Sequence, residues 1–183
     1  TPAGDMGPVE LAAVAEQVAV GGGATRIVIT AGDDLLTDNF PLIHAVGRAA
    51  APQRAPRLID FSWGDSGPML TLVGKGVCFD TGGLNIKSGD GMRNMKKDMG
   101  GAAHALALAR LIISQKLPVR ISLLISAVDN AIAGNAFRPG DVITTGQGLS
   151  VEIDNTDAEG RLVLSDELTL DRELKPELIL DYA

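Results

Sequence analysis

The sequence is poor in several features that mark common classes of protein. It contains one cysteine, Cys78, which cannot form an internal disulfide, so we expect folding in a reducing compartment, the cytoplasm. No apolar run reaches the roughly 20 residues of a transmembrane helix, and no signal-peptide pattern opens the chain. The formal net charge is -7 and no dense basic cluster offsets it, so neither a membrane nor a nucleic acid is an expected partner.

Aromatic residues and histidines are also scarce. Aromatic residues make up 3% of the chain and apolar residues 45%, so the core must consist of Ala, Val, Leu and Ile. A chain of 183 residues is long enough for one domain with such a core. Only His44 and His104 are available as imidazole ligands or bases, and both lie among apolar neighbours, so neither is expected in a functional site.

The two ends of the sequence resemble cuts within a longer protein. Thr1-Pro2-Ala3 lacks an initiator methionine, and residues 178–183 have the pattern of a strand that no further element follows. A strand left at a sheet edge exposes unpaired backbone groups. We therefore expect a fragment, and we expect activity from the longer protein rather than from the fragment alone.

Hydrophobic patterning predicts alternating helices and strands. Helices are predicted at residues 8–20, 42–51, 98–114 and 162–174. Strands are predicted at residues 26–30, 57–61, 69–73, 119–128 and 177–181, with a hairpin at 142–145 and 149–153. The apolar helix at 98–114 is expected to be buried on most sides. This alternation predicts an α/β fold, a three-layer sandwich around a mixed, largely parallel sheet.

A short polar loop, residues 155–161, places two acids and a base close together. Asp157 and Glu159 are two residues apart and point to the same side if the backbone is extended, with Arg161 nearby. The simplest interpretation of such a pair is a solvated turn with acidic residues at the start of a helix. Other parts of the chain decide between a turn and a site.

A glycine-rich polar segment, residues 74–97, is too long for an ordinary connection and is typical of a functional loop. Lys75 is predicted at the end of a strand, Asp80 and Lys87 follow it, and Asp98 stands where the next helix is predicted to begin. Each has a structural alternative. Lys75 could be a surface lysine and Asp80 the start of a turn. Lys87 could belong to a solvated basic loop, and Asp98 could cap a helix. The segment contains no G-x-x-x-x-G-K-[ST] pattern, which excludes a phosphate-binding P-loop.

Four carboxylates are predicted near one another: Asp80, Asp98, Asp157 and Glu159. If they converge without a counter-charge, their mutual repulsion raises their pKa values and costs stability. Two divalent cations would remove this repulsion, and oxygen ligands suit Mg²⁺, Mn²⁺ and, less exclusively, Zn²⁺. Two ions about 3.5–4 Å apart would clamp a water and polarise a carbonyl group for hydrolysis.

Three stretches together resemble one enzyme family, the M17 leucyl aminopeptidases or cytosol aminopeptidases. N-T-D-A-E-G-R-L-V-L at residues 155–164 resembles the family signature. Residues 73–103 resemble its metal-binding region, and N-A-F-R-P-G-D-V at 135–142 resembles a further family loop. The likeness covers nearly the whole chain. It implies that residues 1–183 are part of a metallo-aminopeptidase catalytic domain, without the family's amino-terminal domain and the carboxyl-terminal part of the catalytic domain.

The resemblance implies a role for each polar residue of these stretches. The tightly bound metal would be held by Lys75, Asp80, Asp98 and Glu159, and the exchangeable metal by Asp80, Asp157 and Glu159. The catalytic residues would be Lys87, which stabilises the gem-diolate, and Arg161, which holds a bicarbonate as general base. The substrate-binding residues would be Met95 and Asn155. A lysine ligand must be neutral, and burial beside dications lowers its pKa.

The function implied is a two-metal exopeptidase that uses Mn²⁺ or Zn²⁺. It would hydrolyse the N-terminal amino acid, leucine-like by preference, from peptides, with a metal-bridging water as nucleophile. The family also implies a homo-hexamer of two stacked trimers. Asp129 replaces a more usual glutamate and Cys78 a frequent threonine, and neither is expected to touch the chemistry.

Two other functions compete with this one. The same fold could serve as a non-catalytic metal-binding scaffold or a DNA-binding regulator, as in some relatives of the family. The acidic chain, without a basic stripe, disfavours DNA binding. A different di-metal hydrolase such as a phosphoesterase is disfavoured because no histidine is expected in the site.

Overall fold

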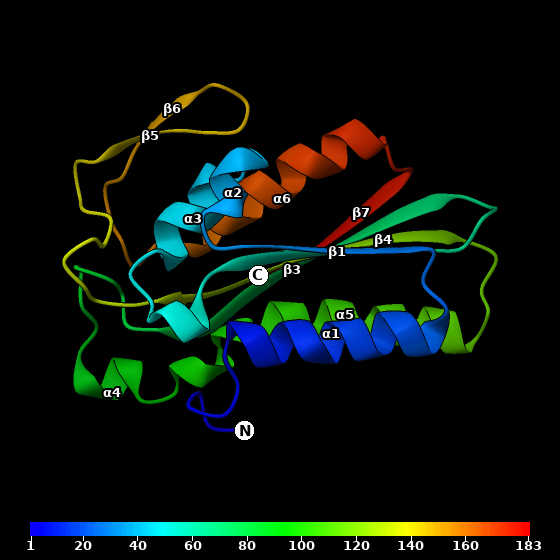
Figure 1. Ribbon diagram of the computed structural model, residues 1–183, viewed down its shortest axis with the longest axis horizontal. Helices are drawn as coiled ribbons and strands as arrows, with labels where there is room; N and C mark the ends of the chain where they lie inside the picture. Colours follow the sequence, from blue (N-terminus) through cyan, green and yellow to red (C-terminus); the bar gives the residue numbers. More distant parts are fainter.

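The chain folds as three layers, with a sheet between two layers of helices (Figure 1). The computed structural model describes residues 1–183, except for the side chains of residues 171–174. One face of the sheet carries α1 (Pro8–Gly22) and α5 (Gly100–Ser114). The other face carries α2 (Asp34–Thr37), α3 (Pro41–Gly47) and α6 (Gly160–Leu174). The predicted three-layer α/β sandwich is therefore confirmed.

The sheet has five strands in the order β1-β2-β4-β3-β7. They are β1 (Arg26–Ala31), β2 (Arg57–Trp63), β3 (Met69–Asp80), β4 (Arg120–Asn130) and β7 (Leu178–Tyr182). β2 is antiparallel to β1 and β4, whereas β3 is parallel to β4 and β7. Only β2 therefore runs against the other strands, as expected for a mixed, largely parallel sheet.

The remaining elements are short. β5 (Val142–Thr144) and β6 (Ser150–Glu152) form the predicted hairpin, apart from the main sheet. The others are η1 (Pro52–Arg54), α4 (Gly89–Met92) and η2 (Met95–Met99), which immediately precedes α5. Among the described residues, no helix is both long and apolar enough to cross a membrane.

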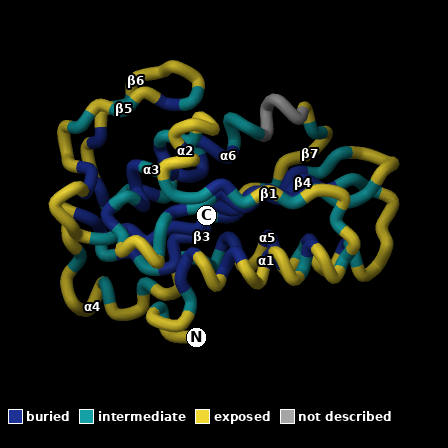
Figure 2. Tube along the Cα trace, in the orientation of Figure 1, coloured by how far each residue is buried: buried dark blue, intermediate teal, exposed yellow. Residues whose placement is uncertain are grey.

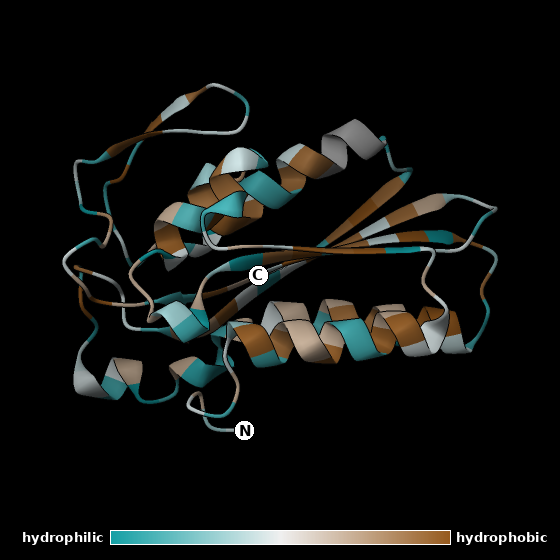
Figure 3. Ribbon diagram, in the orientation of Figure 1, coloured by the Kyte–Doolittle hydropathy of each residue, from teal (hydrophilic) through white to brown (hydrophobic). Residues whose placement is uncertain are grey.

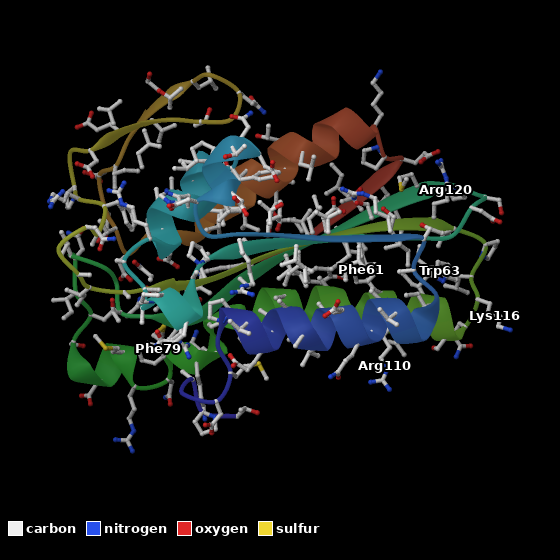
Figure 4. The ribbon with its side chains drawn as sticks, viewed as in Figure 1. Phe61, Trp63, Phe79, Arg110, Lys116 and Arg120 are labelled. Atoms are coloured by element: carbon white, nitrogen blue, oxygen red, sulfur yellow. The ribbon has the colours of Figure 1, made fainter. Side chains whose placement is uncertain are left out.

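Alternating side chains of the central strands fill the two halves of the core. Leu72 and Phe61 pack with α1 and α5, while Val73 and Val77 pack with α3 and α6. Figure 4 places Phe61 between the sheet and the α1–α5 layer. The central strands are the most buried part of the chain (Figure 2). β4 is buried from Ile121 to its end, as its continuous apolar run predicts.

Tertiary contacts also complete the helix ends. α3 lacks a side-chain cap of its own, and Asp166 of α6 supplies one. Its Oδ2 accepts hydrogen bonds from the backbone N–H groups of Leu42, at 2.8 Å, and Ile43, at 3.0 Å. These are first-turn donors that no residue of the helix can satisfy. The contact fastens α3 to the helix that begins at the candidate site.

The most consequential difference from the sequence prediction concerns β3. The strand was expected to end at Val73, but it continues to Asp80 and pairs with β4 along this extension. Gly74 is needed for close packing rather than for a loop, because a Cβ there would lie 2.7 Å from the Cα of Ala102. Lys75 therefore lies within the strand, and its prediction at a strand end was wrong.

Two helix predictions also need correction. The helix expected at residues 42–51 ends at Gly47. The proline at position 52 disfavours helical backbone at the residue before it. The helix predicted from Asp98 begins at Gly100, and it is buried on one face only, since Leu111 is 60% exposed. Apolar residues on α1 and α5 are visible in Figure 3, and Figure 4 shows Arg110 on the outside of α5.

Candidate metal centre

The candidate site lies where β3 and β4 end and α6 begins. Asp80 is the last residue of β3, and Glu159 immediately precedes α6. The carboxyl ends of parallel strands meet at one edge of a sheet, which is where ligand sites form in open α/β folds. A register shift between Val77 and Phe79 precedes Asp80. Such irregularities re-aim the side chains that follow them.

Three acids meet at this edge. Carboxylate oxygens of Asp80, Asp157 and Glu159 lie within 4.8 Å of one another. Asp80 is 2% exposed and Glu159 1% exposed, so two of the three carboxylates are removed from solvent. Asp98 lies outside this group, in η2. The structure thus brings together acids from two segments about 80 residues apart in the sequence.

The loop that carries two of these acids is a turn, and not the extended backbone that would point both acids to the same side. The backbone N–H of Asp157 donates to Asn155 Oδ1 at 2.8 Å, and that of Ala158 donates to the Asn155 carbonyl at 3.1 Å. Glu159 has helical φ and ψ angles of -66° and -29°. An asparagine bonded to the amide two residues ahead is a common turn former. The acids converge because the chain folds back, and not through strand alternation.

Two lysines supply positive charge to the acids. Lys75 Nζ lies 2.8 Å from Asp98 Oδ2 and 3.0 Å from Glu159 Oε1. Lys87 Nζ lies 3.0 Å from Asp80 Oδ2 and 2.5 Å from Asp157 Oδ1. Each lysine therefore joins a carboxylate of the Asp157–Glu159 loop to one from another segment, and the ammonium groups balance part of the negative charge.

A glycine at the start of α6 makes room for one of these lysines. A Cβ on Gly160 would lie 2.9 Å from both Cε and Nζ of Lys75. That separation is shorter than non-bonded heavy atoms tolerate, so any side chain here would push the lysine away. The glycine in the N-T-D-A-E-G-R stretch therefore serves the approach of α6 to β3.

Burial and pairing shift the pKa values of these groups in different directions. Burial raises the pKa of Glu159 to about 7, although Lys75 partly offsets the effect. Burial disfavours the charged amine of Lys75, but the hydrogen bond to Asp98 and the charge of Glu159 outweigh it and raise its pKa. The pKa of Lys87 is raised too, because Asp157 and Asp80 outweigh its desolvation.

The residues fit a divalent cation. Glu159 Oε2 is buried and accepts no hydrogen bond from any described residue, so one oxygen of a buried carboxylate is left for another ligand. Three carboxylates within reach of one point form an all-oxygen donor set, which suits Mg²⁺, Mn²⁺ and, less exclusively, Zn²⁺. An unpaired buried carboxylate oxygen is costly, and a cation removes that cost.

The other candidates are not part of this group of carboxylates. Met95 is partly buried and is the first residue of η2, three residues before Asp98. Asn155 is exposed and shapes the turn described above. Arg161 is exposed in the first turn of α6. Among the described residues it makes no ion pair, and it lines a groove of about 390 Å³ with Asp181 and residues of α6.

The histidines and the cysteine stand apart from the acids. His44 Nε2 contacts Asp33 Oδ1 at 3.2 Å. His104 is exposed and its ring stacks against Tyr182 with centroids 6.2 Å apart, so its expected apolar surroundings are not found. Cys78 is buried, and burial raises the pKa of its thiol to about 12. None of the three belongs to the carboxylate group that could hold a metal.

Sequence reasoning overlooked three polar residues beside the acids: Asn85, Asn130 and Thr156. Thr156 and Asn130 are fully buried, and all three form hydrogen bonds that join the Asp80 segment to the Asp157–Glu159 loop. One signal was available. Gly82 and Gly83 have positive φ angles of 86° and 63°, and a glycine pair beside an acid indicates a close backbone approach.

A larger cleft of about 450 Å³ lies between α1 and α5. Val14, Val18 and Ile113 contribute to its walls, and Arg110 is the only charged residue among the described residues that line it. It contains none of the acids or lysines described above. The residues that line this cleft therefore give no reason to move the candidate site away from the carboxyl edge of the sheet.

Comparison with known proteins gives one consistent family. Residues 1–183 match the cytosol aminopeptidase family, catalytic domain. Peptidase B of Pectobacterium carotovorum subsp. carotovorum (strain PC1) is 42% identical over 189 residues, which cover 100% of this chain and 43% of that protein. The crystal structure of the cytosol aminopeptidase from Coxiella burnetii has a TM-score of 0.94 and 56% identity, and covers 99% of this chain and 39% of that one.

A third similar protein was solved with a metal. The structure of the bottromycin maturation enzyme BotP in complex with Mn has a TM-score of 0.88 and 34% identity, and covers 98% of this chain and 39% of that one. The chain therefore belongs to the cytosol aminopeptidase family, as the sequence motifs indicated. It spans less than half the length of the relatives it matches, 43% of that peptidase B and 39% of the Coxiella enzyme.

Proposed function

We propose that the protein to which this chain belongs is a two-metal aminopeptidase that removes the N-terminal amino acid, leucine-like by preference, from peptides. The observation that carries this proposal is the meeting of Asp80, Asp157 and Glu159, whose carboxylate oxygens lie within 4.8 Å of one another. Membership of the cytosol aminopeptidase family supports it, as does the name of the relative peptidase B.

The proposed cofactors are two divalent cations, Mn²⁺ or Zn²⁺. One would be held by Lys75, Asp80, Asp98 and Glu159, and the other by Asp80, Asp157 and Glu159. Lys75, whose pKa Asp98 and Glu159 raise despite its burial, would have to lose its proton to bind a metal, and the charge of a dication favours that loss. When bound, such ions supply Lewis acidity toward a bridging water and the scissile carbonyl group. The manganese complex of the similar protein BotP supports Mn²⁺ as a fitting ion. Glu159 also favours a cation. Its burial raises the pKa of its carboxyl group, Lys75 offsets this effect only in part, and a dication would stabilise the ionised form.

Two cationic side chains are proposed to act beside the carboxylates. Lys87 holds its ammonium 3.0 Å from Asp80 and 2.5 Å from Asp157, on the more exposed side of the cluster. A fixed positive charge there stabilises the negative charge that develops on the carbonyl oxygen of the substrate. Arg161 offers a planar guanidinium that suits a bicarbonate, which would accept the proton of the attacking water.

The remaining roles concern binding and assembly. Met95 would line the pocket for the first side chain of the substrate, and Asn155, beside Asp157, would help to position its backbone. Peptides are the proposed substrates, and the homo-hexamer and the cytoplasmic location remain predictions. Sedimentation of the natural protein measures its mass and separates a hexamer from smaller assemblies.

Alanine substitutions test the catalytic roles. Asp157→Ala should abolish metal-dependent release of p-nitroaniline from Leu-p-nitroanilide. Lys87→Ala should lower kcat by about 10²–10³-fold, as for loss of a group that stabilises an oxyanion, with little change in metal content. Asp154→Ala is the matched control, because Asp154 is an exposed acid three residues before Asp157. Full activity of Asp157→Ala would contradict the proposal.

The alternative of a non-catalytic scaffold or DNA-binding regulator gives a different outcome in the same assays. A scaffold would bind Mn²⁺ without releasing product, and a regulator would also bind duplex DNA with a strong dependence on salt. No observation on the described residues favours either over hydrolysis. Product release that requires a divalent cation would exclude the scaffold.

A further inference from the structure

Asn130 occupies a central place beside the acids without being one of them. It is the last residue of β4 and lies directly opposite Asp80 in the parallel pairing with β3. Its side chain is fully buried. Its Nδ2 donates to Asp80 Oδ1 at 2.9 Å and to the Thr156 carbonyl at 3.0 Å. Because both partners are acceptors, they also fix the orientation of the carboxamide.

These two bonds connect different segments. Asp80 ends β3, whereas Thr156 lies immediately before Asp157 in the other acidic loop. One rigid carboxamide therefore spans the two segments that supply the three clustered carboxylates. The buried amide has both of its donor hydrogens engaged, which is the arrangement expected of a group that determines geometry.

The carboxylate of Asp80 is oriented by the same contacts. Its Oδ1 accepts from Asn130 Nδ2 at 2.9 Å and from the backbone N–H of Gly82 at 2.8 Å. Its Oδ2 is the oxygen that faces Lys87, at 3.0 Å. With Oδ1 occupied by two donors, Oδ2 is the oxygen presented to a cation.

Asn85 and Thr156 form a second connection between the Asp80 segment and the Asp157–Glu159 loop. The backbone N–H of Thr156 donates to Asn85 Oδ1 at 2.8 Å, and the backbone N–H of Asn85 donates to Thr156 Oγ1 at 2.8 Å. Thr156 Oγ1 in turn donates to the Gly82 carbonyl at 2.7 Å. A Cβ on Gly83 would lie 2.9 Å from Thr156 Oγ1 and 3.0 Å from Asn130 Oδ1, so only glycine fits there.

We propose that Asn130 is a positioning residue for the metal centre, and that its carboxamide sets the separation between Asp80 and the Asp157–Glu159 loop. This proposal rests on the proposed function. In this role Asn130 acts through its contacts with Asp80 and Thr156, and not through a contact of its own with substrate or metal. It acts by holding carboxylates from two segments at the spacing that one cation can share. Groups that orient metal ligands in this way typically contribute 10–100-fold to metal affinity.

The substitution Asn130→Asp tests the proposal with almost no change in shape. It replaces a donor by a carboxylate oxygen opposite two acceptors, Asp80 Oδ1 and the Thr156 carbonyl. We expect Mn²⁺, titrated calorimetrically into the metal-free natural protein, to bind at least one site about 10–100-fold more weakly. The fall in kcat at limiting Mn²⁺ should be partly reversed by excess Mn²⁺, whereas KM at saturating Mn²⁺ should change little.

Asn135→Asp is the matched control, because it makes the same change at an exposed position where Nδ2 donates to the Arg48 carbonyl at 2.7 Å. It should bind Mn²⁺ as the wild type does. Thr156→Val removes the hydroxyl of the second pair and should also weaken Mn²⁺ binding, and Thr156→Ser should restore it. The two Thr156 variants test whether the connection between the two acidic segments governs Mn²⁺ affinity if Asn130→Asp fails to fold.

Several results would overturn the proposal. A folded Asn130→Asp variant with wild-type Mn²⁺ affinity at both sites would do so, even if its thermal stability fell, since Asn130 would then serve stability alone. Wild-type affinity in a folded Thr156→Val variant would also count against it. A wild-type protein that binds no Mn²⁺ or Zn²⁺ would instead refute the proposed function on which the inference rests.

Discussion

At the scale of single residues, Glu167 is a buried acid that the candidate site does not use. It lies in α6, is fully buried, and neither oxygen forms a hydrogen bond of normal geometry with a described residue. Ser126 of β4 is the adjacent polar group, and Asp181 and Asp166 add unfavourable negative charge. Burial therefore raises the pKa of Glu167 well above its usual value. In the folded chain its carboxyl group favours the neutral form.

This shift predicts how stability depends on pH. A carboxyl whose pKa is raised by folding contributes stability below its unfolded pKa of about 4.3, and that contribution is lost as pH rises. Glu167→Gln cannot ionise and has nearly the same shape. We therefore expect its urea midpoint to increase relative to wild type between pH 5 and pH 9. Parallel midpoints for the two proteins over that range would contradict a raised pKa.

At the scale of elements, α5 meets β3 and β7 through a glycine. A Cβ on Gly101 would lie 2.1 Å from the Tyr182 carbonyl oxygen and 3.0 Å from the Lys75 backbone nitrogen. Gly100, one residue earlier, has nothing within 4 Å of a Cβ. The two neighbouring glycines therefore differ sharply in the space around them, although both lie at the start of the same helix.

The pair gives a matched test of how closely α5 must approach the sheet. Gly101→Ala should lower the free energy of unfolding by about 1–3 kcal/mol or more, as overpacking does. Gly100→Ala should be neutral or stabilising by up to ~1 kcal/mol, because alanine favours helix. Urea unfolding of both variants measures the difference. Equal stability of the two would show that α5 can move away from β7.

The same elements show what could be predicted from the sequence. The existence of α1, β4 and the hairpin followed from local patterns: a proline and three glycines that bound α1, a continuous apolar run in β4, and a glycine-containing turn in the hairpin. The extension of β3 to Asp80 did not follow, since glycines that permit packing against α5 have the composition of a loop. The end of α3 was missed because an apolar run outlasted the helix.

The candidate site was predictable to a similar degree. The sequence indicated which acids and lysines would meet, because the family motifs contain them. It did not indicate that Lys75 and Lys87 each bridge carboxylates of separate segments, nor that Asn130 joins those segments. These contacts depend on strand register, and register is fixed by long-range pairing that no local pattern contains.

At the scale of the whole molecule, metal binding should couple to folding. A ligand that binds only the folded state stabilises it in proportion to the logarithm of its concentration, by about 2.7 kcal/mol at 100 times its Kd. Mn²⁺ should therefore raise the Tm of the natural protein, and EDTA should reverse the increase. Asp157→Ala should reduce the increase and Asp154→Ala should not. A Tm that does not respond to Mn²⁺ or Zn²⁺ would count against a metal centre.

The position of Lys75 within β3 has a consequence for hydrogen exchange. β3 pairs with β4 along nearly its whole length and with β7 over residues 70–74, whereas β5 and β6 pair only with each other. Amides in the centre of a sheet exchange with solvent deuterium chiefly through global unfolding, and those of a peripheral hairpin through local opening. Lys75 therefore belongs to the part of the domain that opens last. The amides of the β5–β6 hairpin are therefore expected to exchange many times in the interval between two openings that expose the Lys75 amide.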